Sequence, residues 1–462
     1  MTTAEEHALA PPKWREVFAG ARGRLTAGLL LLEALVAIEA LIVVTILPAV
    51  ENDLGGLALY GWTFTALTLA SFATVPIAGR LVDRVGPTPV LTFALALYVG
   101  GLLIAALAPS MFVLVCGRFV QGIGGGGLYV VSLSAVAKTY PERIRPRVMA
   151  LLASMWILPG LFGPIIGSVI AESVGWRWAF VAPIPAIIVG VAMVIPSLGS
   201  IGSTPNEDRL PVAASLLLML GAGVFLAGLT DPTWPLVILV PVGLAVGLPA
   251  LSRITPRGTF VARAGLPAAA AAAFLASCAF LAVDGFLTLM LTKVRGLSIG
   301  AAGLVITAAS VAWAAGSWYE SRTVGRLGAR RLVTIGALVI AIGTVSVAGG
   351  LVRDLPIVVP YIGWALGGFG MGIVFPSIPL AVMSETTEGR EAGELSGTIL
   401  MDFLGVGVGA GLGGASVALA AADVISLEAG IAGAFGVGLV AALLLAFVAR
   451  RVPDARSVDS AA

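Results

Sequence analysis

The chain has 462 residues, of which 58% are hydrophobic and only 11% are charged. Soluble domains carry about 25% charged residues, so most of this chain must face lipid or other helices, which excludes an ordinary water-soluble enzyme. The net charge of +2 gives no indication of nucleic-acid binding, and two cysteines with a single histidine exclude a disulfide framework and a cysteine metal site. We therefore expect no catalytic residues, no metal and no cofactor.

Fourteen apolar runs of membrane-spanning length follow a polar N-terminal segment. They fall into groups of six, two and six, and the prolines and many glycines inside them are tolerated in membrane helices. The first six lie near 27–50, 59–80, 89–108, 111–137, 148–171 and 178–196. The middle two lie near 211–229 and 234–252, and the last six lie near 266–292, 299–320, 331–350, 356–383, 394–421 and 429–449.

The positions of lysine and arginine predict the orientation. If the N-terminus is cytoplasmic, almost every basic residue falls in a cytoplasmic segment; only Arg177, Lys293, Arg295 and Arg353 fall outside, and Arg118 lies within a helix. So strong a bias predicts that both termini are cytoplasmic. Removing 211–252 as a pair would leave the bias unchanged, so twelve helices stay an alternative to fourteen.

This topology predicts five regions in an all-α membrane protein. We expect a cytoplasmic tail over 1–24, a six-helix bundle over 25–200, a linker with two extra membrane helices over 201–262, a second six-helix bundle over 263–450 and a tail over 451–462.

Three short motifs occur twice, which indicates that the two bundles are related. The charged segment 79–91 (GRLVDRVGPTPVL) recurs at 321–333 (SRTVGRLGARRLV) at an offset of 242. The glycine-rich segments 117–126 and 163–167 recur at 363–372 and 409–413, both at an offset of 246. Three repeats in the same order predict two pseudo-symmetric halves.

The same segments resemble signatures of the major facilitator superfamily. Segment 79–91 is similar to its loop between helices 2 and 3, with Pro87 and Thr88 in place of a basic pair, and 114–124 is similar to its helix 4 signature through Arg118, Gln121, Gly122 and Gly124. Gly163, Pro164 and Gly167 resemble the antiporter signature of helix 5. Segment 39–55 resembles the helix 1 motif of the fourteen-helix drug:proton antiporters, with Glu39 in place of its aspartate and Leu41 and Val44 in place of polar residues.

The resemblance implies a multi-pass transporter of the cell membrane that works by alternating access. It implies proton-coupled export of hydrophobic or cationic small molecules, driven by a proton gradient, by a monomer in the lipid bilayer. A metabolite or nutrient symporter on the same fold is the alternative, and a transporter-like receptor or assembly partner without transport is a third.

Buried charges are the first candidates for a site, because an ionisable group in the bilayer costs about 2.5–3.5 kcal/mol on insertion scales. Glu39 and Arg118 lie at similar depths in the first and fourth helices, so we expect a direct or water-mediated pair that couples protons to transport. A structural ion pair is the alternative. Asp284 is expected to bind a second proton or a cationic substrate, with an idle acid in an aqueous cavity as the alternative.

Further residues are candidates for the substrate cavity. Glu33 lies about 120° round the helix from Glu39, where it lines the cavity or belongs to the interface. The other candidates are Gln121, Asp402 and the aromatic residues Trp156, Trp313 and Trp364.

Two glycine-containing segments are expected to serve conformation. The resemblance places Gly79, Arg80, Asp83, Arg84 and Gly86 at the cytoplasmic junction of the halves. There we expect Arg80 or Arg84 to pair with Glu385, Glu388, Glu391 or Glu394 when that side is shut, with solvated surface charges as the alternative. Gly163, Pro164 and Gly167 are expected to bend the fifth helix.

Overall fold

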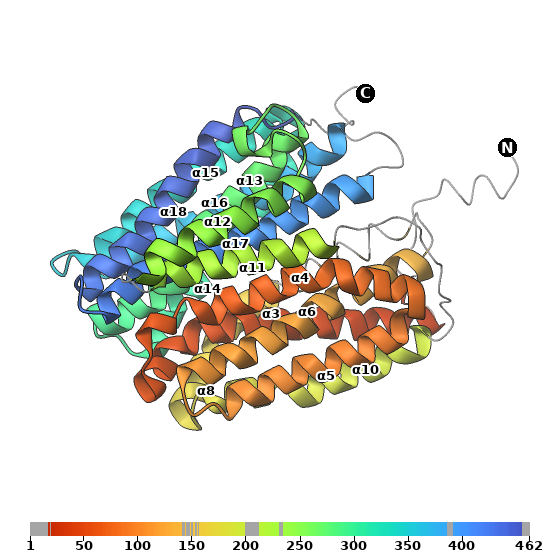
Figure 1. Ribbon diagram of the computed structural model, residues 1–462, viewed down its shortest axis with the longest axis horizontal. Helices are drawn as coiled ribbons and strands as arrows, with labels where there is room; N and C mark the ends of the chain where they lie inside the picture. Colours follow the sequence, from red (N-terminus) through yellow and green to blue (C-terminus); the bar gives the residue numbers. More distant parts are fainter. Residues whose placement is uncertain are drawn as a thin grey trace, which may run out of the picture.

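The computed structural model describes residues 17–18, 20–140, 144, 148, 151–152, 155, 157–198, 212–230, 234–385 and 391–454. Every regular element within these ranges is helical, as expected for an apolar chain that must satisfy its backbone polar groups inside a bilayer. Figure 1 shows the N-terminal helices on one side, the C-terminal helices on the other, and α11 between them.

The N-terminal half and the two extra helices contain ten elements. They are α3 (Gly20–Leu54), η1 (Leu57–Leu59), α4 (Trp62–Val85), α5 (Pro87–Ala106), α6 (Met111–Thr139), α8 (Ile157–Ser173), α9 (Arg177–Val181), α10 (Ile184–Leu198), α11 (Val212–Thr230) and α12 (Trp234–Ile254).

The C-terminal half contains nine elements. They are η2 (Thr259–Val261), α13 (Leu266–Leu289), η3 (Met290–Val294), α14 (Ile299–Leu327), α15 (Ala329–Ala348), η4 (Gly349–Leu351), α16 (Val358–Glu385), α17 (Glu391–Ala421) and α18 (Leu427–Ala449). Of these, η3 is a π-helical turn that continues α13.

Twelve helices in the described part of the chain are long and apolar enough to cross a membrane. The other two expected spans coincide with α8 and α11, whose apolar stretches Phe162–Ser173 and Ala213–Leu229 are shorter. Part of the expected span 148–171 lies outside the described residues. The chain is therefore a multi-pass membrane protein, whereas the count of fourteen spans and the cytoplasmic position of the termini stay predictions.

The two halves are built alike where the sequence repeats. Gly86 ends α4 and Gly328 ends α14 with nearly the same backbone, at φ 84° and ψ 166° against φ 78° and ψ 151°. Each amide hydrogen-bonds to the carbonyl four residues earlier, at Val82 and Val324. A positive φ suits glycine because a Cβ would be strained there. The repeated glycine thus reverses the chain in the same way in both halves.

The glycine-rich repeat produces the same helix packing twice. Gly122 of α6 lies against the carbonyl of Leu67 in α4, and Gly368 of α16 lies against the carbonyl of Ala309 in α14. A Cβ added to either glycine would meet that oxygen at 2.2 Å or 2.1 Å. Glycine here permits close helix approach, and the two matching contacts fit the pseudo-symmetry predicted from the repeats.

The extra helices form a hairpin. Helices α11 and α12 pack on each other, and α11 also packs on α4 and α17. Leu226 of α11 is fully buried against Gly411 of α17. The hairpin therefore joins the two halves through α11, and α12 lies further out.

One end of the molecule carries most of the described arginines, and we call it the arginine-rich face. It includes the α12–α13 loop, the α14–α15 turn and the end of α18. Arg451 binds the carbonyls of Val261 and Ala262, and Arg330 binds the carbonyl of Val452, which ties these segments together. The other end is called the opposite face.

Candidate functional site

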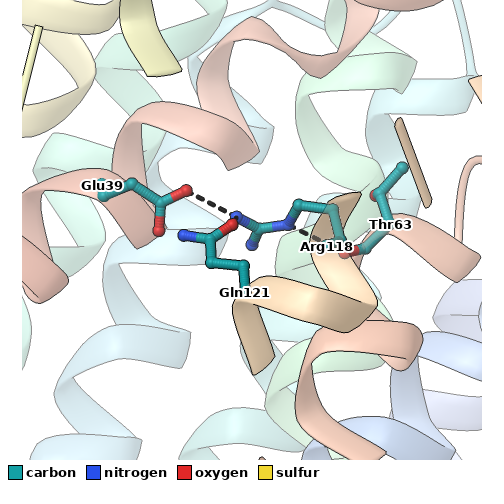
Figure 2. Close-up of polar contacts among 4 residues, drawn as sticks. All are labelled: Glu39, Thr63, Arg118 and Gln121. Carbon is teal, nitrogen blue, oxygen red and sulfur yellow. Dashed lines mark hydrogen bonds and ion pairs between the residues drawn. The ribbon is translucent and has the colours of Figure 1, made fainter. Parts of the chain in front are cut away.

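A buried ion pair lies in the middle of the N-terminal half. Arg118 Nη1 lies 2.5 Å from Glu39 Oε1, and the two residues are only 3% and 2% exposed. The same guanidinium donates to Gln121 Oε1 at 2.7 Å and, through Nε, to the carbonyl of Thr63 at 3.2 Å. Figure 2 shows these four residues converging from α3, α4 and α6. The expected contact between Glu39 and Arg118 is confirmed.

Helix geometry explains why these side chains meet. Arg118 and Gln121 are three residues apart on α6, so they project from the same face of that helix. The neighbouring glycines of α6 bring the α4 backbone close enough for Thr63 to offer its carbonyl to Arg118. The arginine therefore has a counter-charge and two neutral acceptors, which is what a buried cation requires.

Two polar groups complete this cluster. Tyr98 of α5 is buried against Gly124 and Gly125 of α6, one turn along that helix from Gln121. Gln121 Nε2 is buried without a hydrogen-bond partner in the described part of the chain. An unsatisfied donor of this kind costs about 1–3 kcal/mol, so the cluster can accept a further ligand, a water or a rearranged partner.

The C-terminal half holds a buried acid of a different kind. Trp364 Nε1 donates to Asp284 Oδ1 at 2.7 Å, with Asp284 on α13 and Trp364 on α16, both buried. The indole stacks on Phe280 with ring centroids 4.8 Å apart, and Trp313 meets the same phenyl ring edge-on at 5.3 Å. Asp284 has no cation within salt-bridge distance among the described residues. Its carboxyl group is balanced by one neutral N–H, and the indole that supplies this N–H belongs to an aromatic cluster with Phe280 and Trp313.

Asp402 lies closer to the arginine-rich face. Its Oδ1 accepts a hydrogen bond from Ser277 Oγ, and it lines a small apolar cavity of about 70 Å³ with Phe375 and Thr398. Tyr129 of α6 packs edge-on against Phe403, the neighbour of Asp402 on α17. The two halves therefore meet close to Asp402. Glu33 is half-buried on α3, and its place in the cavity stays a prediction.

The aromatic candidates differ in their surroundings. Trp364 is fully buried and engaged with Asp284, whereas Trp313 is half-buried between Phe280 and Phe375. Trp156 lies outside the described residues. A role for these residues in binding substrate stays a prediction.

Part of the expected gate lies outside the described side chains, including Asp83, Glu388, Glu391 and Glu394. Arg84 and Glu385 are exposed, and no ion pair joins Arg80 or Arg84 to Glu385 in the part described. Glu385 instead lies beside Gly265, near the start of α13. A pairing at this junction stays a prediction for a state in which this face is shut.

The halves meet firmly at the opposite face. Lys293 Nζ lies 2.5 Å from Glu51 Oε2, and Thr288 Oγ1 donates to the carbonyl of Val44 at 2.9 Å. Glu172 Oε1 accepts the backbone N–H of Gly300 in the first turn of α14, at 3.1 Å. An acid suits a helix N-terminus because its N–H groups lack partners within the helix. These three contacts, which we call the inter-half latch, join α3 and α8 to α13, η3 and α14.

Two backbone approaches complete this closure. Gly61, next to the start of α4, faces Gly414 of α17, and a Cβ added to Gly61 would lie 2.5 Å from the Gly414 Cα. Pro164 of α8 lies next to Gly303 of α14, while Gly163 and Gly167 of α8 lie next to α3. The glycines of α8 therefore help it pack between α3 and α14, and a bend at this segment stays a prediction.

Several of these partners were not singled out from the sequence. Tyr98, Ser277 and Thr288 occur in apolar sequence with no motif around them. Glu51 lies within segment 39–55 but is not one of the residues compared with the helix 1 motif, and Lys293 entered only the prediction of orientation. A search for every polar residue within the apolar runs would have found Tyr98, Ser277 and Thr288. No group of three or more potential metal ligands occurs in the described ranges.

Comparisons with known proteins agree with this geometry. A model of the Major Facilitator Superfamily matches residues 29–198. A probable multidrug-efflux transporter of Mycobacterium tuberculosis is 28% identical over 91% of this chain and 94% of its own length. The multidrug transporter protein MdtP of Bacillus subtilis is 26% identical over 78% of this chain and 69% of its own.

Solved structures show the same fold at low identity. An auto-inhibited peptide transporter of the POT family superposes with a TM-score of 0.68 at 16% identity, covering 94% of this chain and 98% of the other. A D-xylose-proton symporter superposes with a TM-score of 0.65 at 15% identity, covering 95% and 99%. At such identities the likeness concerns the fold alone.

Proposed function

We propose that this chain exports hydrophobic and cationic small molecules in exchange for protons. The proposal starts from its family: the chain belongs to the major facilitator superfamily, and is thus a membrane transporter of small molecules and not an enzyme. The whole-length likeness to proteins named multidrug-efflux transporters supports the direction and the substrate class. The observation that carries proton coupling is the buried contact between Glu39 and Arg118.

This contact suits proton exchange because its two charges depend on each other. An ionised carboxylate inside the bilayer is costly unless a cation lies beside it. When a proton binds Glu39, Arg118 loses its counter-charge and must strengthen other contacts, for which Gln121 and the Thr63 carbonyl already lie within reach. Protonation therefore favours a different arrangement of α3, α4 and α6, and a moving helix couples the proton to substrate release.

The C-terminal half supplies the negative charge that a cationic substrate needs. Asp284 is hydrogen-bonded to Trp364, whose ring packs in a cluster with Phe280 and Trp313. Aromatic faces together with a carboxylate attract organic cations. We propose that Asp284 alternates between a proton and such a substrate. Both occupants neutralise the carboxylate, so they compete for it.

The inter-half latch supports a cycle of alternating access. The halves are held together at the opposite face by Lys293 with Glu51, Thr288 with Val44, and Glu172 with α14. With the termini in the cytoplasm, this arrangement is the state closed to the outside. Opening to the outside requires these contacts to break while contacts form at the arginine-rich face, as two bundles rock about a central site.

Flux through proteoliposomes tests the proposal. Purified full-length protein is reconstituted, the vesicles are loaded at acid pH, and tetraphenylphosphonium or ethidium is added outside. Exchange predicts that cation uptake accompanies proton efflux, whereas co-directional flux would indicate symport. Absence of flux for a panel of cations and neutral drugs would contradict the proposal.

A matched pair of variants separates coupling from general damage. Glu39→Gln removes the buried acid, and Glu428→Gln removes an exposed acid whose nearest cation, Arg353, is 3.9 Å away. We expect the first variant to lose proton-coupled flux and the second to retain it. Normal coupling in Glu39→Gln would exclude Glu39 as a proton carrier.

A further inference from the structure

An apolar groove lies between the extra hairpin and the C-terminal half. It has a volume of about 470 Å³, and α11, α12, α13, α17 and α18 all contribute to its walls. Its lining is almost entirely hydrophobic, for example Phe225, Leu248, Phe274 and Leu444. The groove is distinct from the Glu39 cluster and from the aromatic site around Asp284, because it shares no residue with them.

The position of the groove in the membrane restricts what fills it. Leu248 and Leu444 in its wall are about half exposed on the lipid-facing surface of the protein. Water does not occupy apolar cavities without polar partners, and small-molecule sites have volumes of about 300–1,000 Å³. A hydrocarbon chain therefore fits this groove in both chemistry and size.

One end of the groove reaches the arginine-rich face. Thr259, Phe260 and Ala262 of the α12–α13 loop line that end. Phe260 and Val261 are 58% and 68% exposed there, as expected for apolar side chains that dip into the interfacial layer of a bilayer. The loop backbone is held in place by Arg451, which binds the carbonyls of Val261 and Ala262.

Three arginines lie next to residues of this end along the chain. Arg253 and Arg257 are each two positions from a residue that lines the groove, Leu251 and Thr259 respectively. Arg263 directly follows the lining residue Ala262. Their Cα atoms are thus within about 7 Å of groove residues along the chain. All three side chains are exposed, and within the described ranges none forms an ion pair. Glu385 lies near Gly265, and the arginines outnumber it.

An apolar groove with excess positive charge at its interfacial end has the chemistry to bind a molecule with a hydrocarbon chain and an anionic headgroup. We propose that the groove binds an anionic phospholipid, with an acyl chain between α12 and the C-terminal half and the phosphate held by Arg253, Arg257 and Arg263. Guanidinium groups bind phosphate through paired hydrogen bonds. The lipid adds a contact between α12 and the C-terminal half, because α12 packs chiefly on α11 and only α11 packs on α17. This inference does not depend on the proposed transport reaction.

Lipid titration of the purified, delipidated full-length protein tests the site. Dioleoylphosphatidylglycerol and dioleoylphosphatidylcholine are compared, since they share acyl chains and differ in net charge. Native mass spectrometry counts the lipids retained, and thermal unfolding reports stabilisation. We expect the anionic lipid to be retained and to raise the unfolding temperature more than the zwitterionic lipid does.

Three variants locate the effect. The triple variant Arg253→Gln, Arg257→Gln, Arg263→Gln should weaken binding of the anionic lipid roughly 100-fold, at about one kcal/mol per charge near the surface. Leu248→Trp, which fills the groove and leaves every charge in place, should weaken the binding of both lipids. The control removes three exposed arginines near the α14–α15 turn by the substitutions Arg322→Gln, Arg326→Gln and Arg331→Gln. It should bind both lipids as the parent does.

Two results would overturn the inference. Equal retention of the two lipids by the parent would show that the site does not select a net negative headgroup, which contradicts the proposed anionic lipid. Unchanged binding of the anionic lipid in both the triple variant and Leu248→Trp would place the lipid elsewhere on the protein.

Discussion

Arg118 and Trp364 occupy equivalent positions in the two halves, 246 residues apart in the repeat that begins at Gly117 and Gly363. Each side chain donates to a buried carboxyl group, Arg118 to Glu39 and Trp364 to Asp284. One donor carries a charge and the other does not. The N-terminal half therefore contains a neutralised pair, and the C-terminal half contains an acid balanced by a single neutral hydrogen bond.

This difference shows that the two halves share a glycine-mediated helix packing but not the chemistry beside it. The glycines that set the helix contacts are the same in both halves, as at Gly122 and Gly368, whereas the polar residue beside the first glycine of the repeat has changed. In the proposed function, Arg118 neutralises the acid of the N-terminal half, whereas Asp284 in the C-terminal half receives a cationic substrate instead. Four substitutions test this comparison, and they are ordered by their expected effect on stability.

Glu39→Gln should have the largest effect. Glutamine keeps an acceptor for Arg118 but leaves the guanidinium without a counter-charge, and removing one partner of a buried pair costs about 3–5 kcal/mol. We expect a clear fall in unfolding temperature in detergent, with folded protein still recovered at low temperature. The double variant Glu39→Gln, Arg118→Gln should recover part of this loss. If its loss of stability equals the sum of the losses in Glu39→Gln and Arg118→Gln, the two residues are not coupled.

Trp364→Phe should come next. Phenylalanine keeps an aromatic ring against Phe280 but removes the N–H that Asp284 accepts, and an unsatisfied buried acceptor costs about 1–3 kcal/mol. The loss of stability caused by Trp364→Phe should be smaller in a chain that also carries Asp284→Asn, since a neutral amide depends less on the indole N–H than a carboxylate does. A double-mutant cycle by thermal unfolding measures this coupling, and a coupling energy of zero would contradict the assigned contact.

Ser277→Ala should have a smaller effect. The substitution removes the hydroxyl that donates to Asp402, and one hydrogen bond contributes about 0.5–1.5 kcal/mol. Because Asp402 is only partly buried and lines a cavity, water can replace the lost donor. Thermal unfolding of this variant beside Ser416→Ala, whose hydroxyl bonds only within its own helix, isolates the contribution of Asp402.

Asp284→Asn should change stability least and transport strongly. The amide oxygen still accepts from Trp364, and a neutral side chain avoids the cost of a charge in the bilayer. We expect the unfolding temperature to match or exceed that of the parent, while binding of tetraphenylphosphonium, measured by calorimetry, falls at least tenfold. A stability loss as large as that of Glu39→Gln would mean that the two halves are chemically alike.

Sequence reasoning located the Glu39–Arg118 contact for a simple reason. Arg118 is the one basic residue placed inside an expected span, so it had to be balanced by an acid at similar depth, and Glu39 met that condition. The repeats at Gly86 and Gly328 were equally informative, because a glycine that reverses the chain is constrained by its own backbone and needs no knowledge of distant partners.

The contact between Trp364 and Asp284 could not be found in the same way. The sequence gives the depth of a residue along its helix, but the direction in which it points depends on how six helices pack. Tryptophan also packs, lines cavities and lies at interfaces equally well. The latch at Glu51, Lys293 and Glu172 was missed for a related reason: surface charges at helix ends are common, and only the meeting of the halves makes them partners.

The hairpin of α11 and α12 restricts how many helices can be inserted between the two halves. A hairpin returns the chain to the side of the bilayer from which it set out, so α13 enters from the same side as it would without the insertion. Any even number of added helices preserves the pseudo-twofold relation between the halves, whereas an odd number would invert the second half and destroy it. Membrane sidedness thus restricts insertions at this junction to whole pairs.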